Sequence, residues 1–181
     1  MTYDPQIHHR ISIRLKDYDY SQAGAYFVTI CTRNRESMLG EIVDDEMILN
    51  EFGQVVAECW DWLAGQYEYV ELAEWIVMPN HTHSIVVISV KEDSRRGGSR
   101  TAPTKSLGRL VGAFKTVSTK RINQMRHTPG ATVWQRNYYE HVIRNEDELN
   151  HLRQYILDNP VQWNMDEDNP NRPGVKLCRI K

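Results

Sequence analysis

The spacing of apolar positions along this chain changes between two and three to four residues, which predicts both strands and helices. Residues 26–32 alternate apolar and polar side chains, and residues 69–78 lead through a Pro-Asn turn into a second strand-like run that starts at His81. Both runs are rich in β-branched and aromatic residues, as strands usually are. Two shorter runs, 39–43 and 46–49, flank a pair of aspartates and predict a hairpin.

Helical spacing appears in three segments. Residues 50–64 repeat apolar side chains every three and four positions, and a second helix is expected to begin near Lys105. The buried stripe of that second helix is predicted to comprise Leu107, Leu110, Val111, Phe114, Val117 and Ile122. A third helix is predicted over residues 146–158, with Asn145 as its N-cap. It should end at Asn159-Pro160, because proline has no N–H and disfavours helical geometry in the preceding residue.

These elements predict an α+β fold, an antiparallel sheet with helices packed on one of its faces. Residues 133–142 are expected to add a further strand before the last helix. With 181 residues, 40% of them apolar, the chain fits one domain. Its core should span about 24–163, with an N-terminal arm over 1–23 and a C-terminal tail over 164–181. The tail is polar and contains prolines, so we expect a loosely held cover or a disordered end.

The composition and the first residues of the sequence bear on the cellular compartment in which the protein is expected. The sequence has no apolar run near eighteen residues, and its start lacks the basic and apolar regions of a signal peptide. We therefore expect a cytoplasmic protein without a membrane partner. Cys31, Cys59 and Cys178 are odd in number and scattered, which argues against a disulfide framework and against a cysteine zinc site.

A net charge of −2 conceals a strong asymmetry along the chain. Residues 1–90 carry 5 basic and 14 acidic side chains, whereas residues 91–126 carry 10 basic and 2 acidic ones. Such a basic segment is typical of a nucleic-acid contact, although an ordinary solvated helix face is an equally good interpretation of any single lysine. The candidate phosphate contacts are Arg95, Arg96, Arg100, Lys105, Arg109, Lys115, Lys120 and Arg121.

Two histidines stand one residue apart at the start of the strand that follows the Pro-Asn turn. Because side chains alternate along a strand, His81 and His83 should share one face while Thr82 points to the other. Two adjacent imidazoles can bind one metal ion, and rigid strands position ligands well. A pair of surface or core histidines is the competing interpretation.

The last predicted helix carries the other candidate residues at four-residue steps: His151, Tyr155 and Asn159. If this helix packs over the histidine strand, the Asn159 amide oxygen can complete a metal shell and the Tyr155 phenol lies beside it. Tyr138 and Tyr139, near the helix start, are rival candidates for a nucleophile. His151 could orient the phenol or a phosphate, or could be a plain surface histidine.

These residues carry a resemblance. His81-Thr82-His83 looks like the HUH motif of the single-tyrosine transposases, and the chain is similar to the REP-associated tyrosine transposases, which are related to the small insertion-sequence transposases. Five blocks in consistent order carry the similarity: Phe27 to Arg35, Trp75 to His83, Leu107 to Lys115, Trp134 to Arg144, and Tyr155 to Val161. The chain departs from the pattern at Thr82, where a bulky hydrophobic residue is typical, and its hydroxyl needs a hydrogen-bond partner.

The resemblance implies a ferredoxin-like palm and a transposase that acts on single-stranded or hairpin DNA. It implies Tyr155 as the nucleophile that retains the 5′ phosphate, and His81, His83 and Asn159 as ligands of Mg²⁺ or Mn²⁺; the ligand types alone do not exclude zinc. Members of the wider group act as monomers or homodimers, so both assemblies stay open. Two other functions remain compatible with the sequence: a hairpin-binding protein that cuts little, and a metallonuclease that uses water as nucleophile.

Overall fold

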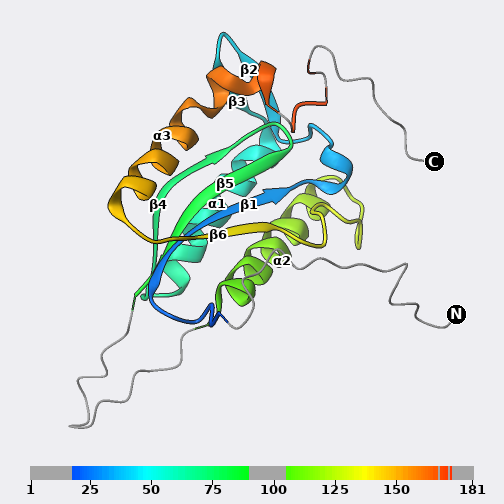
Figure 1. Ribbon diagram of the computed structural model, residues 1–181. Helices are drawn as coiled ribbons and strands as arrows, with labels where there is room; N and C mark the ends of the chain where they lie inside the picture. The colour runs from blue at the N-terminus through cyan, green and yellow to red at the C-terminus, as the bar shows by residue number, and fades with distance from the viewer. Residues whose placement is uncertain (1–17, 90–104, 167, 171, 173–181) are drawn as a thin grey trace, which may run out of the picture.

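The computed structural model describes residues 18–89, 105–166, 168–170 and 172. Its elements follow one another in an order that mixes short strands with three α-helices (Figure 1). They are β1 (Gly24–Cys31), β2 (Gly40–Val43), β3 (Glu46–Leu49), α1 (Glu51–Gln66), β4 (Val70–Val77), β5 (His81–Ile88), α2 (Leu107–Met125), β6 (Tyr139–Ile143) and α3 (Glu146–Gln162). Single 3₁₀ turns cover Arg33–Arg35 and Trp163–Met165.

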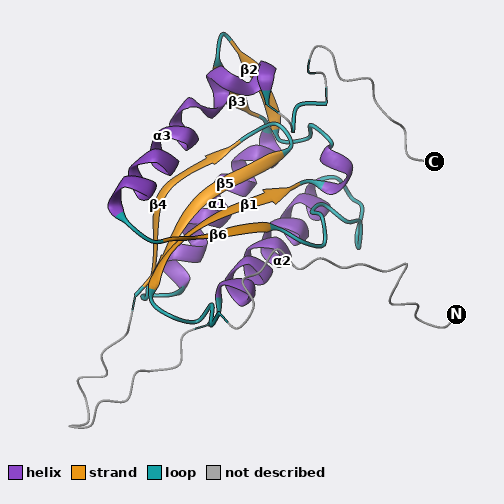
Figure 2. Ribbon diagram, viewed as in Figure 1, coloured by secondary structure: helices purple, strands orange, loops and turns teal. Residues whose placement is uncertain are grey.

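The main sheet has four strands in the order β4-β5-β1-β6, and each neighbouring pair is antiparallel (Figure 2). Helix α1 lies between β1 and β4 in the chain, and α2 lies between β5 and β6. Two such split βαβ units with this strand order make the ferredoxin-like arrangement that was predicted. The β2–β3 hairpin is inserted before α1, and its turn residues Asp44 and Asp45 both have positive φ, as a tight hairpin turn requires.

The helices cover both faces of the sheet, so the expectation of helices on one face was wrong. Helices α1 and α2 enclose the larger core with Tyr26 and Val86, whereas α3 packs on the opposite face against Phe27 and Ile85. The physical reason is that β1 and β5 carry apolar residues at odd and even positions alike. Both faces therefore need cover.

Helix boundaries follow capping chemistry at their starts. The Asn50 side chain accepts hydrogen bonds from the backbone N–H groups of Phe52 and Gly53, and Asn145 caps α3 through Glu148. At the other end the prediction for α3 was wrong, because the helix runs through Pro160 to Gln162. Burial of Ile156 and Asn159 against the sheet holds this turn although Pro160 donates no backbone hydrogen bond.

The strand predicted over 133–142 forms only in its second half, as β6. In the first half of this stretch, the backbone pairs with residues at and just beyond the end of β1. The Arg33 N–H donates to the Val133 carbonyl (2.7 Å), and the Gln135 N–H donates to the Cys31 carbonyl (2.9 Å). Between these two paired regions, residues 136–138 leave the ladder. This irregular segment brings side chains to the rim of the cavity described below.

Two glycines of α1 give a matched test of the packing. A Cβ at Gly53 would lie 2.1 Å from the Leu39 carbonyl oxygen, whereas a Cβ at Gly65 meets nothing within 4 Å. Because alanine favours a helix interior over glycine by about 1 kcal/mol, Gly65→Ala should stabilise the protein slightly. Gly53→Ala should instead destabilise it by at least ~2 kcal/mol, because backbone must move. Urea unfolding of both variants measures this, and equal effects would contradict the close approach.

Candidate functional site

Strand β5 places its two histidines on the face covered by α3. The side chains of His81 and His83 are 0% and 3% exposed. Thr82 points to the opposite face, where its hydroxyl accepts a hydrogen bond from Trp60 Nε1 (3.0 Å) and donates one to the Ile76 carbonyl (2.7 Å). The departure from the motif is thus accommodated, because the threonine hydroxyl has both partners that burial demands.

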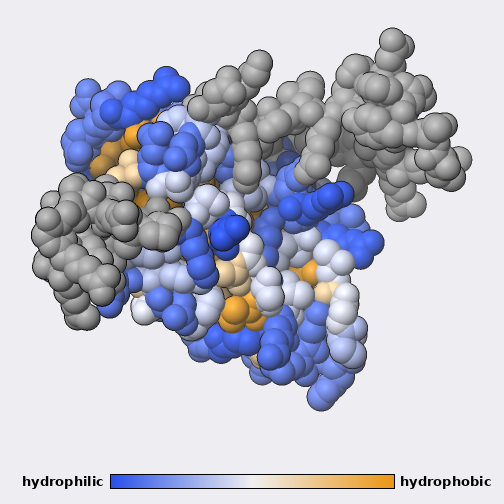
Figure 3. Space-filling model, turned by 90° about the horizontal axis from the view of Figure 1, so that it is seen from below, coloured by the Kyte–Doolittle hydropathy of each residue, from blue (hydrophilic) through white to orange (hydrophobic). Residues whose placement is uncertain are grey.

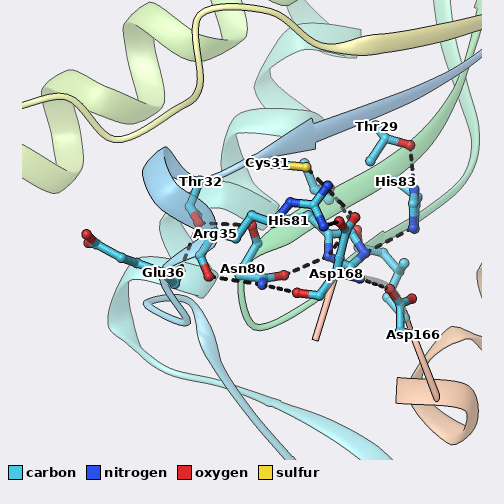
Figure 4. Close-up of polar contacts among 12 residues, drawn as sticks. Thr29, Cys31, Thr32, Arg35, Glu36, Asn80, His81, His83, Asp166 and Asp168 are labelled. Atoms are coloured by element: carbon cyan, nitrogen blue, oxygen red, sulfur yellow. Dashed lines mark hydrogen bonds and ion pairs between the residues drawn. The ribbon is translucent and has the colours of Figure 1, made fainter. Parts of the chain in front are cut away.

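Each imidazole is oriented through its Nδ1 atom (Figure 4). His81 Nδ1 lies 2.8 Å from Asn80 Oδ1, and His83 Nδ1 lies 2.8 Å from Thr29 Oγ1. The Asn80 amide is itself fixed, since its Nδ2 donates to the carbonyls of Arg35 (3.1 Å) and Asp168 (2.6 Å). Its oxygen can only accept, so His81 carries its proton on Nδ1 and leaves Nε2 with a free lone pair.

The two Nε2 atoms face each other at 3.0 Å. Because His81 Nε2 has no proton, this contact is a hydrogen bond donated by His83 Nε2, and His83 Nδ1 then accepts from the Thr29 hydroxyl. A hydroxyl both donates and accepts, so Thr29 can also serve the opposite tautomer of His83. The pair is therefore held in place without being locked to one proton arrangement.

Burial keeps both imidazoles neutral. Desolvation lowers the pKa of His83 well below its ordinary value, and the neighbouring His81 acts in the same direction. Desolvation also lowers the pKa of His81, against the opposing pull of the Asp168 and Asp166 carboxylates. Neutral imidazoles are the form that binds a metal ion.

Helix α3 brings the two other predicted residues to the same place. The Tyr155 ring lies 5.3 Å from the His83 ring and 6.0 Å from the Phe27 ring, centroid to centroid. Asn159 is 1% exposed, and its side chain lies beside His81, where it favours a higher pKa of that imidazole. No described residue gives the Asn159 Oδ1 atom a hydrogen bond of normal geometry. A buried amide oxygen in this state requires an explanation, and a bound ion is one that the neighbouring imidazoles would suit.

A cavity of about 1040 Å³ opens over this cluster. It is lined by His83, Tyr155 and His151, and also by the rival tyrosines Tyr138 and Tyr139. Tyr139 is 48% exposed with its ring 6.4 Å from Phe27, and the Tyr138 ring lies against the Lys115 ammonium at 5.4 Å. Of the three tyrosines, Tyr155 is the one whose ring packs on a motif histidine and whose helix also carries the orphaned amide.

The described part of the C-terminal tail lines one side of the cavity. Of the two predicted alternatives, a loosely held cover and a disordered end, these residues form a cover, although specific contacts hold it. Asp168 forms an ion pair with Arg35 and lies 4.0 Å from His81 Nδ1 (Figure 4). Asn169 is buried, and its Nδ2 donates to the Trp163 carbonyl at 2.9 Å. Asp166 also lines the cavity. Carboxylates thus stand near the histidines.

The predicted DNA-contacting residues divide into distinct groups. Arg95, Arg96 and Arg100 lie outside the described residues. Arg121 pairs with Glu58 of α1, and the Lys105 ammonium donates to the Tyr67 hydroxyl at 2.8 Å. These side chains are engaged within the protein.

Lys115 has a structural role that the sequence did not reveal. Its Nζ donates to the carbonyls of Gln135 and Asn137, both at 2.9 Å, and burial lowers its pKa to about 8. Arg109 and Lys120 are both exposed on the same helix. These two are therefore the described cations of this set that remain accessible for a phosphate contact.

Sequence reasoning missed the residues that support the site. Thr29, Asn80 and Arg35 each contact the histidines or their partners. The signal available for Asn80 was its position in the Pro-Asn turn directly before the motif. Thr29 carried no local signal, because its contact depends on the antiparallel register that sets it opposite His83.

The described residues contain few side chains that could bind a metal ion together. Within them, no group of three His, Cys, Asp or Glu side chains converges as a metal site, so a metal here would need the asparagine and outside ligands.

None of the described helices is both long and apolar enough to cross a membrane. The face seen from below is largely hydrophilic, with small separate hydrophobic patches (Figure 3).

Comparison with known proteins gives several relatives. The chain is 36% identical to an uncharacterized protein of Haemophilus influenzae over 179 residues, which covers 91% of this chain and 96% of that protein. It is 26% identical over 144 residues to the REP-associated tyrosine transposase of Escherichia coli K12, covering 79% of this chain and 70% of that protein. No family model matches the sequence.

A solved structure shares the fold. It is a REP-associated tyrosine transposase bound to a REP hairpin, with a TM-score of 0.58 and 23% sequence identity. The likeness covers 83% of this chain and 74% of the other. The ferredoxin-like sheet with its added helices is therefore an architecture already known among transposases.

The protonation of the histidine pair can be tested directly. Because burial lowers the pKa of both imidazoles, His81 and His83 should stay neutral from pH 8 down to about pH 6.5, the ordinary midpoint of histidine. Long-range ¹H–¹⁵N NMR spectra in EDTA should show His81 protonated on Nδ1 throughout. A midpoint at or above 6.5 for either buried ring would contradict the assignment.

Proposed function

This chain belongs to the family of REP-associated tyrosine transposases, and from that premise we propose that it cleaves and rejoins single-stranded or hairpin DNA through a covalent bond to Tyr155. One observation carries the proposal: the Tyr155 phenol and the His83 imidazole line one cavity, and behind them the buried His81 imidazole and Asn159 amide lie beside His83. Each of these groups has a defined task in phosphodiester cleavage.

We further propose His81, His83 and Asn159 as the ligands of a divalent cation. The site fits such an ion, since two ligands at right angles and about 2.1 Å from the metal lie about 3.0 Å apart, the separation of the two Nε2 atoms. The Asn159 oxygen supplies a third ligand of the neutral kind that Mg²⁺ or Mn²⁺ accepts. When bound, the ion would polarise the scissile phosphate and stabilise the leaving oxygen.

Tyr155 acts as the nucleophile in this scheme. Its oxygen attacks phosphorus, the bond from phosphorus to the 3′ oxygen breaks, and the 5′ phosphate stays on the tyrosine. The phenol loses one proton and the 3′ oxygen gains one, so the step is balanced without a co-reactant. The packing of the ring against Phe27 and His83 fixes its direction of approach, and such positioning supplies much of the rate.

Covalent storage allows the strand to be rejoined. Attack by a 3′ hydroxyl on the phosphotyrosine reverses the first step and restores a phosphodiester, so no nucleotide cofactor is needed. The cavity wall formed by residues 135–139 leaves room for a strand to approach, since Tyr139 is half exposed there. A flexible unpaired strand fits an open cavity better than a rigid duplex does.

The nucleophile is tested by a matched pair of variants. Tyr155→Phe should abolish covalent protein–DNA adducts with labelled hairpin oligonucleotides, because phenylalanine keeps the packing and removes the attacking oxygen. Tyr139→Phe should retain adducts. Denaturing gels with Mg²⁺, Mn²⁺ or EDTA measure both.

The same gels separate the alternatives. Adducts from Tyr155→Phe would refute the assignment of the nucleophile. Metal-dependent cleavage without any adduct would favour a hydrolytic nuclease that uses water. Tight binding without cleavage under any metal would favour a hairpin-binding protein.

The metal site is tested through Thr29, which must accept the Nδ1 proton of His83 once Nε2 binds the ion. Thr29→Val keeps the shape of the side chain but removes the hydroxyl, and loss of such an outer partner typically costs 10 to 100-fold in metal affinity. Thr29→Ser should bind Mn²⁺ as the wild type does. Isothermal titration without DNA gives the comparison, and equal affinity of the valine variant would argue against this ligand set.

A further inference from the structure

A second cavity, of about 860 Å³, lies beside the catalytic one. Its walls are the C-terminal half of α2 and the loop over residues 127–136. The size is within the range of about 300 to 1,000 Å³ that small-molecule sites occupy. None of the features described so far requires such a hollow.

The charges at this cavity have one sign. Among the described residues that line it there is no aspartate or glutamate, whereas Lys115, Lys120 and Arg136 are all basic. Lys115 is occupied by two carbonyls, but Lys120 and Arg136 are exposed and form no ion pair with a described residue. An anionic ligand is therefore favoured over a neutral or cationic one.

The interior suits a flat heterocycle. Its floor includes Val133 and Trp134, and the indole is held by a hydrogen bond from Trp134 Nε1 to Ser118 Oγ (2.9 Å). Thr119 and the exposed amide of Gln124 stand on the α2 side, where they can contact the edge of a base. The cations at the rim suit the phosphate of a nucleotide, and the apolar interior with its amide group suits the base.

The two cavities adjoin at one residue. Gln135 lines both of them, and its backbone is fixed on either side, by its N–H bond to Cys31 O and by the Lys115 bond to its carbonyl. Lys115 also holds Asn137 of the catalytic cavity. A strand whose phosphate lies at Tyr155 can thus pass Gln135 and place its next nucleotide in the second cavity.

We propose that the cavity between α2 and the 127–136 loop binds one nucleotide of the DNA single strand adjacent to the phosphodiester that Tyr155 attacks, and so helps to select the cleavage site. This inference rests on the proposed function. It adds a base-reading position away from the histidines and from the tyrosine. Lys120 and Arg136 would contact the flanking phosphate, and the base would occupy the interior.

The test uses the full-length protein and single-stranded oligonucleotides that carry one abasic position each, stepped along both sides of the cleavage site. Thr119→Trp fills the cavity, and Met125→Trp is the control, since Met125 is exposed on the same helix and does not line the cavity. Fluorescence anisotropy in EDTA measures binding without cleavage.

At one position next to the cleaved phosphate, wild type and Met125→Trp should lose roughly tenfold in affinity when the base is removed, as expected for one bound base. Thr119→Trp should bind the intact strand as weakly as wild type binds the abasic one. It should also be indifferent to the abasic site. Full sensitivity of Thr119→Trp, or no sensitive position in wild type, would overturn the proposal.

A charge variant keeps the proposal testable if the tryptophan variant does not fold. Lys120→Gln with Arg136→Gln changes two exposed side chains that would contact one phosphate, so it should lower the slope of log affinity against log salt by about 0.7 for a single strand. An unchanged slope would contradict the binding of a nucleotide in this cavity. Adducts from wild type together with these negative results would refute the second cavity alone, whereas absence of adducts from wild type would refute the proposed function.

Discussion

The register of β5 is the constraint on which the rest of the structure depends. A shift by one residue would turn every side chain of this central strand to the other face. The Thr82 hydroxyl fixes the register, because it bonds to Trp60 on the core side and to the Ile76 carbonyl of the neighbouring strand. While Thr82 keeps those partners, His81 and His83 must face α3. The residue that departs from the family motif therefore holds the motif in place.

The two faces of the sheet have different roles: one carries most of the hydrophobic core, and the other carries the candidate functional residues. The face under α1 and α2 carries the large core, including Trp60 stacked on Phe114 with ring centroids 4.1 Å apart. The other face has a small apolar cluster in which Ile156 is the buried contact from α3. Polar groups take the remaining space under α3 because their packing partners are imidazoles. Helix α3 is thus held partly by the site itself, which explains why its last turn persists through Pro160.

Much of this organisation was predictable from local patterns, and the failures have a common cause. The hairpin, the cap at Asn145, and the shared face of the two histidines follow from rules that act over a few residues. The end of α3, the burial of Asn169 and the roles of Thr29 and Lys115 depend on partners far away in sequence. Arg121, which was predicted as a phosphate contact, pairs with Glu58. Local chemistry gave the candidates, and tertiary contacts decided between them.

Helix α2 connects the two cavities through a single buried cation. The Lys115 ammonium holds the carbonyls of Gln135 and Asn137, residues on either side of the break between the two paired regions near β1. Because two backbone carbonyls occupy the Lys115 ammonium, this lysine stabilises the local backbone conformation rather than attracting DNA. The irregular 136–138 segment can then stay out of the sheet and still keep a defined position. Its shape sets the boundary between the cavity beside Tyr155 and the second one, so the proposed path of a DNA strand from one cavity to the other depends on the stiffness of this segment.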